Sequence, residues 1–306
     1  MTQAVLRFAP SPNGRLHLGH AYSALLNAQT ARRLHGRLLL RIEDIDTTRC
    51  RPDFERAIHE DLAWLGLSFE EPIRRQSDHF ADYRCAAEAL RQRRLLYPCF
   101  CTRGALGEAA RHREATTGLP ALRDPDGAPL YPGTCRDLGS AKAAELIAKG
   151  VPHAWRLRMD EAAAGAGPLV FTAFDLDGTE RIAEARPERW GDAVLVRKET
   201  PTSYHLSVVV DDALQGVTHV VRGQDLEAAT DLHRLLQALL GLPVPAYHHH
   251  GLIRAPEGDK LSKSLRSESL ADLRARGVTA EDIIRRLGFD PWGLSPSPKP
   301  AAEYGG

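Results

Sequence analysis

The sequence predicts an α/β protein built on a parallel sheet, with one long segment inserted into the alternation of strands and helices. The first observation is a strand expected at residues 5–9, a helix at 19–36 and a second strand at 38–42, since this order forms a βαβ unit with parallel strands. The second observation is that residues from about 96 to 184 lose this alternation, which resumes afterwards. Ligands of such folds bind beyond the carboxyl ends of the strands.

Each element of the βαβ unit has a local cause. The apolar run Val5–Ala9 stops at Pro10-Ser-Pro-Asn-Gly14, where two prolines and an Asn-Gly pair indicate a turn. Apolar residues then recur at helical spacing until Gly36 ends the helix. A second apolar run at 38–42 completes the unit.

The pattern resumes in the last third of the chain. Apolar and β-branched runs predict strands at 206–210 and 218–221, and a helix is expected at 228–240. A further helix begins near Thr279, whose hydroxyl caps it with Asp282 at the capping-box spacing. We therefore interpret the interrupting segment as an insertion between two halves of one nucleotide-binding domain.

Composition excludes several classes of protein. The chain has 306 residues with 40 basic and 40 acidic side chains, so it does not hold nucleic acid by bulk positive charge, although a local basic face remains open. No apolar run approaches the ~18 to 20 residues of a membrane span. Five cysteines without a targeting segment predict a reducing compartment. We expect a cytoplasmic monomer that makes no membrane contact.

Two histidines lie three residues apart at the junction of the first strand and helix, in His17-Leu-Gly19-His20. Residues i and i+3 share a face at a helix start, where free N–H groups favour an anion. Gly19 lets the backbone approach a triphosphate closely. For this motif alone, a pair of solvated loop histidines is the alternative.

Lysine is scarce, because only six of the 40 basic residues are lysines. Two of the six lie in Gly258-Asp-Lys260-Leu-Ser-Lys263-Ser264, the lysine loop. Lysine offers a compact, mobile charge where arginine offers a rigid fork. The two ammonium groups and two hydroxyls of the lysine loop can close on a phosphate that is transferred or released. An exposed polar turn is the alternative for this segment alone.

The two motifs together resemble the HIGH and KMSKS signatures of class I aminoacyl-tRNA synthetases. Asn13 and Leu261 stand where the family usually has Thr and Met, and both keep the local chemistry. The resemblance runs from Arg7 to about Ser264. Four flanking segments are similar to the glutamyl subgroup of this family: Arg7-Phe-Ala-Pro-Ser-Pro, Arg41-Ile-Glu43-Asp-Ile-Asp46, Val208-Val-Val-Asp-Asp212 and Val221-Arg222-Gly-Gln-Asp225.

The resemblance implies a division of the chain into three parts. A Rossmann-type catalytic domain comprises residues 1–95 and 185–253, and a zinc-binding, acceptor-type subdomain is inserted at 96–184. The lysine loop and a short helical tail follow at 254–306, without an anticodon-binding domain.

The resemblance also implies the residues that bind glutamate. Fixed guanidinium groups at the strand ends, from Arg7 and Arg222, suit a carboxylate because arginine binds it through two parallel hydrogen bonds. Glu43 can take the ammonium group, and Tyr204 can donate a hydroxyl. A surface ion pair is the alternative for either arginine taken singly. The implied set is Arg7, Ala9, Ser11, Glu43, Tyr204 and Arg222.

The implied reaction is attack of the glutamate α-carboxylate on the α-phosphorus of ATP, which gives glutamyl-adenylate and pyrophosphate. No protein nucleophile is required, because the protein supplies alignment and charge stabilisation. The catalytic residues are then His17, His20, Lys260 and Lys263, and Gly19 joins His17, His20 and Lys263 in binding ATP. Mg²⁺ is expected with ATP.

Three cysteines of the insertion form a third cluster, in Cys99-Phe-Cys101 and Tyr131-Pro-Gly-Thr-Cys135. Thiolates on two short loops predict one structural Zn²⁺, which takes a fourth ligand. Chemistry alone leaves His112 or a carboxylate such as Asp137 open for that place, whereas the resemblance implies Tyr131. Three buried free thiols are the alternative to a metal site.

Only 42 residues follow Ser264, fewer than the ~100 of a separate anticodon-reading domain. The chain therefore resembles truncated paralogues of the glutamyl enzymes, which attach glutamate to the queuosine base in the anticodon loop of tRNA(Asp). The expected partners are ATP, L-glutamate and the tRNA(Asp) anticodon stem-loop. Three alternatives stay open: a conventional enzyme that charges tRNA(Glu), an idle RNA-binding paralogue, and another nucleotidyl transferase.

Overall fold

The computed structural model describes residues 3–253 and 268–291. Two compact units divide the chain. Unit 1 contains residues 1–75, 221–224 and 249–306, and unit 2 contains residues 76–220 and 225–248. The domain boundaries expected from the sequence stay a prediction. The lysine loop lies outside the described residues.

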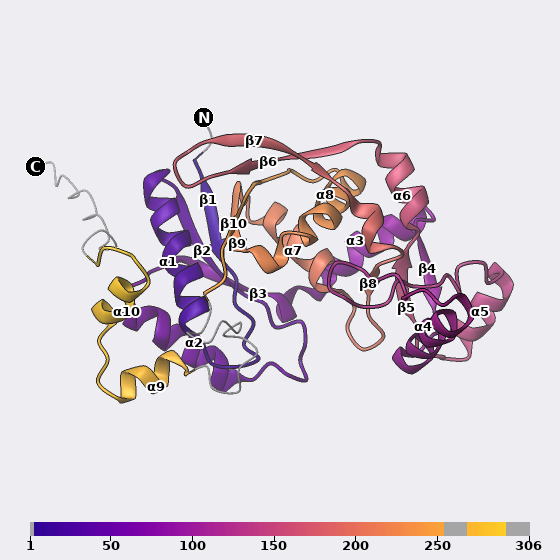
Figure 1. Ribbon diagram of the computed structural model, residues 1–306, viewed down its shortest axis with the longest axis horizontal. Coiled ribbons are helices and arrows are strands. Elements are labelled where there is room, and N and C mark those ends of the chain that lie inside the picture. Colours follow the sequence, from indigo (N-terminus) through magenta and orange to yellow (C-terminus); the bar gives the residue numbers. More distant parts are fainter. Residues whose placement is uncertain (1–2, 254–267, 292–306) are drawn as a thin grey trace, which may run out of the picture. The chain divides into compact units, whose positions relative to one another are not determined.

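Unit 1 is built on a parallel three-stranded sheet in the order β1-β2-β3 (Figure 1). Its strands are β1 (Val5–Phe8), β2 (Arg37–Ile42) and β3 (Glu70–Arg75). Helix α1 (Leu18–Arg33) connects β1 to β2 and packs against both. The predicted βαβ unit is confirmed, and the carboxyl ends of β1 and β2 lie at the same edge because the strands are parallel.

The described residues of unit 1 also form three shorter helices: α2 (Pro52–Trp64), α9 (Leu270–Ala275) and α10 (Ala280–Arg286). The predicted cap of the last helix is confirmed. Thr279 Oγ1 accepts a hydrogen bond from the Asp282 N–H at 3.1 Å, and the Asp282 carboxylate accepts one from the Thr279 N–H at 3.0 Å. Helix α9 begins with the same reciprocal arrangement, between Ser269 and Asp272.

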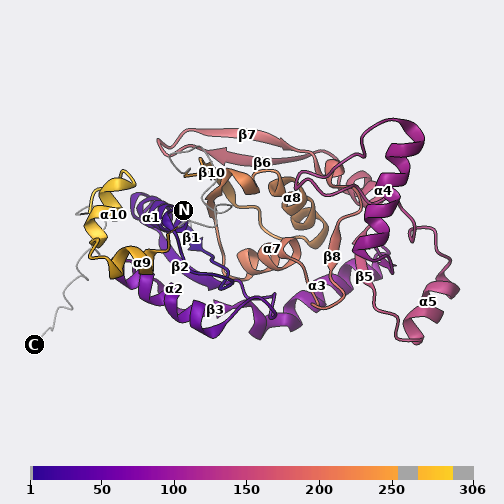
Figure 2. The same ribbon diagram turned by 60° about the horizontal axis from the view of Figure 1, so that its bottom comes forward.

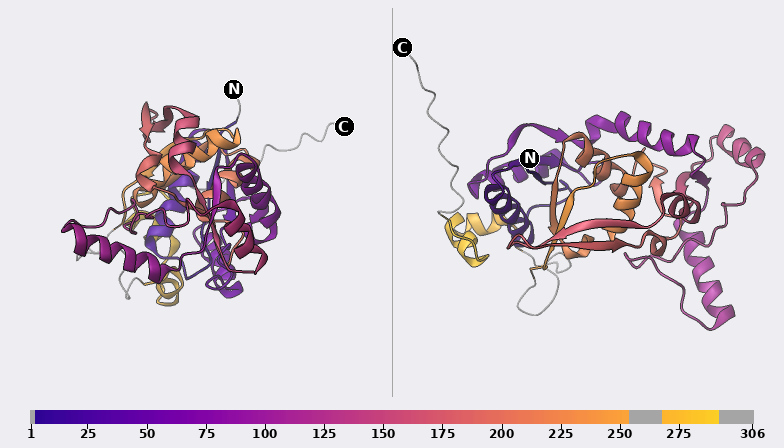
Figure 3. Two further views of the ribbon diagram at one scale, coloured as in Figure 1. Left: turned by 90° about the vertical axis from the view of Figure 1, so that its right-hand side faces the viewer. Right: turned by 90° about the horizontal axis from the view of Figure 1, so that it is seen from above.

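Unit 2 contains most of two further sheets. The first is antiparallel, in the order β4-β5-β8. In the second, of order β7-β6-β10-β9, β6 and β7 form a long antiparallel hairpin that Figures 2 and 3 show, and β10 runs parallel to β6. Strands β9 and β10 begin in unit 2 and continue into unit 1. The strands are β4 (Leu96–Cys99), β5 (Ala154–Leu157), β6 (Leu169–Phe174), β7 (Glu180–Ala185), β8 (Val194–Val196), β9 (His219–Gly223) and β10 (Ala246–His250).

Helices pack against these sheets. Helices α3, α7 and α8 contact one another, and α8 also contacts the β6–β7 hairpin. Among the described residues, no helix combines the length and the apolar character needed to cross a membrane. The helices are α3 (Phe80–Gln92), α4 (Arg103–Thr117), α5 (Ser140–Ala148), α6 (Met159–Ala166), α7 (Tyr204–Leu214) and α8 (Ala229–Leu240), with 3₁₀ turns η1 (Gln76–His79), η2 (Pro187–Trp190) and η3 (Gln224–Leu226).

The strand predicted at residues 206–210 is wrong, because this segment lies inside helix α7. Ser203 caps the helix, its hydroxyl accepting a hydrogen bond from the Leu206 N–H at 3.4 Å. Every residue from 206 to 212 is buried, so no polar face reveals the helical period. The tertiary contacts with α3 and α8 override the strand preference of three consecutive valines.

A buried carboxylate fixes α7 against the start of α3. Asp211 is fully buried and accepts hydrogen bonds from Gln76 Nε2 at 2.7 Å and from the Tyr83 hydroxyl at 3.0 Å. Hydrogen bonds to a charged group are stronger than those between neutral groups. Tyr204 is the first residue of this anchored helix.

Candidate functional site

The loops that follow β1 and β2 are joined at the carboxyl edge of the unit 1 sheet. The Glu43 N–H donates to the Pro10 carbonyl at 3.0 Å, and the Arg51 N–H donates to the Pro12 carbonyl at the same distance. Ser11 Oγ lies 3.6 Å from Cys50 Sγ, on the second loop. Two of the predicted glutamate-binding residues, Ser11 and Glu43, are therefore held on hydrogen-bonded neighbouring loops.

Two buried arginines belong to the same unit. Arg7 of β1 is 4% exposed and Arg222 of β9 is 5% exposed. The Arg222 Nε donates to His249 Nε2 at 3.4 Å. The amide of Asn27, on α1, donates to the carbonyl of Val221 at 3.1 Å, so α1 holds the strand segment that carries Arg222. A guanidinium group stays charged at all relevant pH values, which suits it to bind a carboxylate.

Strand β2, which leads into the second of these loops, also carries a buried arginine. Arg41 has no exposed surface, and its Nε lies 3.4 Å from the Glu43 carboxylate. Ala9 follows β1 directly and is half-buried. Tyr204 belongs to unit 2, whereas Arg7, Ala9, Ser11, Glu43 and Arg222 belong to unit 1. The role of all six in glutamate binding stays a prediction.

Helix α1 begins with a reciprocal cap made by two histidines. His17 Nδ1 accepts a hydrogen bond from the Gly19 N–H at 3.1 Å, and His20 Nδ1 accepts one from the His17 N–H at 3.2 Å. The two ring centroids lie 3.9 Å apart. Because both Nδ1 atoms accept, these bonds assign the proton of each neutral ring to Nε2. The predicted helix start at these residues is confirmed, whereas the cap was not predicted, although their i, i+3 spacing is a signal for it.

Burial keeps both rings neutral. It lowers the pKa of His17, and it lowers the pKa of His20 to about 3, with the neighbouring His17 adding to the effect. At neutral pH the two imidazoles are therefore N–H donors and not cations. Their Nε2–H groups, at the N-terminal end of α1, form a site suited to a phosphate.

Gly19 has a steric role in this cap. A Cβ atom on Gly19 would lie 3.0 Å from His17 Cε1 and 3.2 Å from His17 Nδ1. The ring of His17 thus occupies the space that any other residue would need. A Cβ atom on Gly14, in the preceding loop, would have no heavy atom within 4 Å.

The chain on both sides of the lysine loop lies against α1 and its N-terminus. The Leu270 N–H donates to the Leu16 carbonyl at 2.8 Å, and Ser269 forms an isolated bridge with His17. On the other side, the ring of His250 lies 5.1 Å from that of Tyr22 on α1. Lys260 and Lys263 themselves lie outside the described residues, and their predicted roles stay predictions.

Helix α9, which follows the lysine loop, is fixed to α2 by an ion pair with a buried carboxylate. Arg274 Nη1 lies 3.4 Å from the carboxylate of Asp61, which has no exposed side-chain surface. Burial raises the pKa of Asp61, and Arg274 opposes that rise. Because an unpaired charge is costly to bury, this pair favours one position of α9 on α2.

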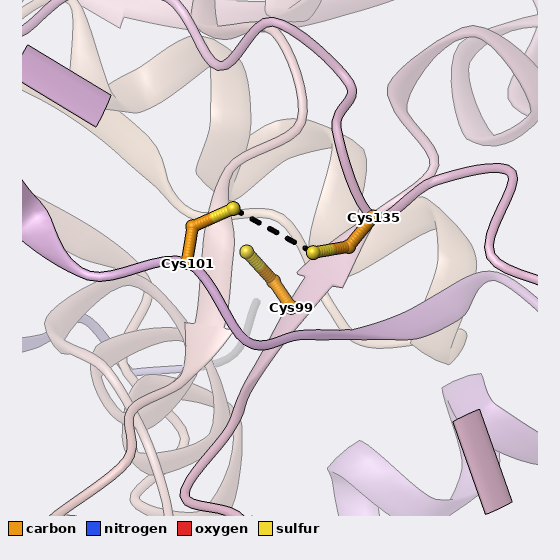
Figure 4. Close-up of side chains that lie close together, drawn as sticks. All are labelled: Cys99, Cys101 and Cys135. Carbon is orange, nitrogen blue, oxygen red and sulfur yellow. Dashed lines mark hydrogen bonds between the residues drawn. The ribbon is translucent and has the colours of Figure 1, made fainter. Parts of the chain in front are cut away.

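The three cysteines of the predicted zinc site lie together (Figure 4). The sulfur atoms of Cys99, Cys101 and Cys135 all lie within 4.8 Å of one another, and those of Cys101 and Cys135 are 3.6 Å apart. Tetrahedral zinc with Zn–S bonds of ~2.3 Å needs sulfur atoms ~3.8 Å apart. The cluster therefore fits a zinc ion.

Tyr131 supplies an oxygen atom beside these sulfurs. Its hydroxyl lies 3.8 Å from Cys101 Sγ and accepts a hydrogen bond from the Cys135 N–H at 2.7 Å. Burial raises the pKa of Cys101 to about 11 and raises that of Tyr131 as well. Both groups are therefore protonated at neutral pH without a metal, and binding one would release protons. A bound zinc would tie β4 to the loop that carries Cys135.

The βαβ unit, its histidine-capped helix and the flanks of the lysine loop define the catalytic domain of a class I aminoacyl-tRNA synthetase. The family described as "tRNA synthetases class I (E and Q), catalytic domain" matches residues 3–295. The chain belongs to this family. It is an enzyme of the synthetase class, a ligase.

Its relatives fall into two groups by name. It is 48% identical to the "Glutamyl-Q tRNA(Asp) synthetase" of Rhodobacter capsulatus, over 93% of this chain and 100% of that protein. It is 41% identical to "Glutamate--tRNA ligase 2" of a Methylobacterium species, over 89% of this chain and 57% of that protein. A solved glutamate tRNA ligase from Elizabethkingia meningosepticum, crystallised with its amino acid, has a TM-score of 0.69 at 28% identity, over 90% of this chain and 53% of that one.

The cysteine cluster predicts about one zinc per chain. Cys101→Ser should remove most of the metal, because a hydroxyl binds zinc far more weakly than a thiolate. Cys85→Ser is the matched control, since Cys85 is exposed. Elemental analysis of protein produced with added zinc measures the content. Equal zinc in the two variants, or none in the wild type, would overturn the metal site.

The histidine cap predicts a loss of stability in acid. Because the pKa of His20 is lower in the folded chain than its ordinary 6.5, the unfolded chain binds the proton first, and stability falls as the pH drops below ~6.5. The glutamine of His20→Gln can still accept the hydrogen bond of the cap, but it does not titrate. Between pH 6.5 and 5, the wild type should lose about 2 kcal/mol more unfolding free energy than this variant in urea titrations.

The control for this measurement is His59→Gln, since His59 is exposed on α2. That variant should keep the pH dependence of the wild type. If His20→Gln also kept the pH dependence of the wild type, the inference that His20 is neutral in the folded chain would be wrong.

Proposed function

We propose that this chain activates L-glutamate with ATP and transfers the glutamyl group to the queuosine base in the anticodon loop of tRNA(Asp). The observation that carries the proposal is the 48% identity with the Rhodobacter capsulatus glutamyl-Q tRNA(Asp) synthetase over the whole of that protein. Two further relatives with this name, from Symbiobacterium thermophilum and Nocardia farcinica, are each 39% identical.

The buried arginines support glutamate as the amino acid. Arg7 and Arg222 offer fixed positive charge in unit 1, and Glu43 offers a carboxylate for the ammonium group. A carboxylate can accept two parallel, charge-assisted hydrogen bonds from an arginine, which the neutral amide of glutamine cannot match. Tyr204 is the proposed donor to the substrate from α7.

The activation step needs alignment and charge stabilisation. A glutamate α-carboxylate oxygen bonds to the α-phosphorus of ATP while the bond from that phosphorus to the pyrophosphate oxygen breaks. In this proposal the Nε2–H groups of His17 and His20 bind the phosphates at the N-terminal end of α1. Lys263 neutralises the leaving pyrophosphate while Lys260 supports the lysine loop, and Mg²⁺ on ATP supplies further positive charge.

The transfer step forms an ester. A hydroxyl of queuosine attacks the carbonyl carbon of glutamyl-adenylate, the bond from that carbon to the phosphate oxygen breaks, and AMP leaves. The alternative acceptor is the 3′ end of tRNA(Glu). It is favoured by the 41% identity with the Methylobacterium glutamate–tRNA ligase, although the chain spans only 57% of that protein.

The acceptor is tested by incubating the enzyme with ATP, labelled glutamate and defined tRNAs. We expect base-labile label only on queuosine-containing tRNA(Asp), because the ester forms on that base. The matched control is the same tRNA(Asp) transcribed with guanosine in place of queuosine, which should stay unlabelled. Labelling of tRNA(Glu) instead would support the conventional synthetase.

The histidine cap is tested with two glycine variants. Gly19→Ala should slow glutamate-dependent ATP–pyrophosphate exchange by at least ~10-fold, because its Cβ displaces His17 and loosens at least one phosphate contact. Gly14→Ala adds the same methyl group where no atom lies within 4 Å and should stay within ~2-fold of the wild type. Equal rates for the two variants would contradict this role of His17.

A further inference from the structure

Four rings gather where helices α7 and α8 begin in unit 2. Tyr204 and His205 are the first two residues of α7, His233 lies in the second turn of α8, and Trp190 ends η2. The Tyr204 ring lies 5.4 Å from that of His205 and 5.6 Å from that of His233. The ring of Tyr204 is thus flanked by two imidazoles.

The two imidazoles are hydrogen-bonded to each other. His205 Nδ1 lies 3.2 Å from His233 Nε2, and His233 is only 2% exposed. One ring must donate and the other accept, so the bond sets a fixed orientation of both rings. It also links the first turn of α7 to the body of α8.

Trp190 fixes His205 from another direction. Its ring lies 5.0 Å from that of His205, edge to face, and its Nε1 donates to the Ala228 carbonyl at 3.1 Å, at the start of α8. Arg189, the preceding residue, pairs with the buried carboxylate of Asp231 at 2.6 Å. η2 and α7 are therefore both tied to the same two turns of α8.

We propose that His205 and His233 are positioning residues that hold the Tyr204 hydroxyl for the amino-acid substrate. The proposal rests on the glutamate-binding role of Tyr204 proposed above. His233 acts through its hydrogen bond to His205 and its contact with the Tyr204 ring, and it does not touch the substrate.

Packing alone does not account for this arrangement. An apolar side chain at position 233 would fill the same buried space without the cost of desolvating ring nitrogens. A hydrogen bond adds direction, which apolar contact lacks. The bond joins the two rings that flank Tyr204. By orienting these rings, it helps to fix the position of the tyrosine hydroxyl.

The test compares two replacements of His233 in the full-length enzyme by ATP–pyrophosphate exchange. His233→Leu keeps bulk but removes the hydrogen bond, and should raise the KM for glutamate ~5- to 20-fold while the KM for ATP stays within ~2-fold. His233→Gln keeps a donor and an acceptor and should recover most of the glutamate affinity. His219→Leu is the control, since His219 is a half-buried histidine of unit 2 that is hydrogen-bonded to its neighbour Thr218.

The partner variant, His205→Leu, keeps the proposal testable if His233→Leu does not fold. It should show the same rise in the KM for glutamate, and the double variant should be no worse than either single one, because both remove one bond. Equal rises in both KM values, or an unchanged KM for glutamate, would overturn the positioning role. Loss of glutamate-dependent exchange in the wild type would instead overturn the proposed function itself.

Discussion

The reciprocal cap between His17 and His20 is the interaction on which the rest of unit 1 depends. It sets where α1 begins, uses the Nδ1 atoms of both rings and leaves their Nε2–H groups as donors. A Cβ atom at position 19 would press on the His17 ring. The same three residues thus form the cap and the phosphate site that we propose.

Helix α1 connects this cap to the other parts of unit 1 through its contacts. Asn27 holds the strand segment beside Arg222, and Tyr22 contacts the ring of His250, which precedes the lysine loop. The backbone of Leu16 binds Leu270, which follows that loop. One helix thereby contacts both the segments proposed to bind the amino acid and those proposed to bind the phosphates. The two histidines are neutral, so in the proposed reaction the fixed positive charge comes from the arginines and the two lysines.

Local signals predicted much of this structure. The βαβ unit and the Thr279 cap follow from residues that are neighbours along the chain, and the cysteine cluster follows from short spacings in two loops. Helix α7 was mistaken for a strand because burial on all sides hides its period. The His205–His233 bond joins residues 28 positions apart, and no local sequence pattern predicts such a contact.

The most direct test of the account is ATP–pyrophosphate exchange by the purified enzyme in the absence of any RNA. The exchange should occur with glutamate, and should be at least ~100-fold weaker with glutamine or aspartate, because in this proposal the arginines form charge-assisted hydrogen bonds with a carboxylate at one distance from the α-carbon. No exchange with glutamate, or equal exchange with glutamine, would contradict the account.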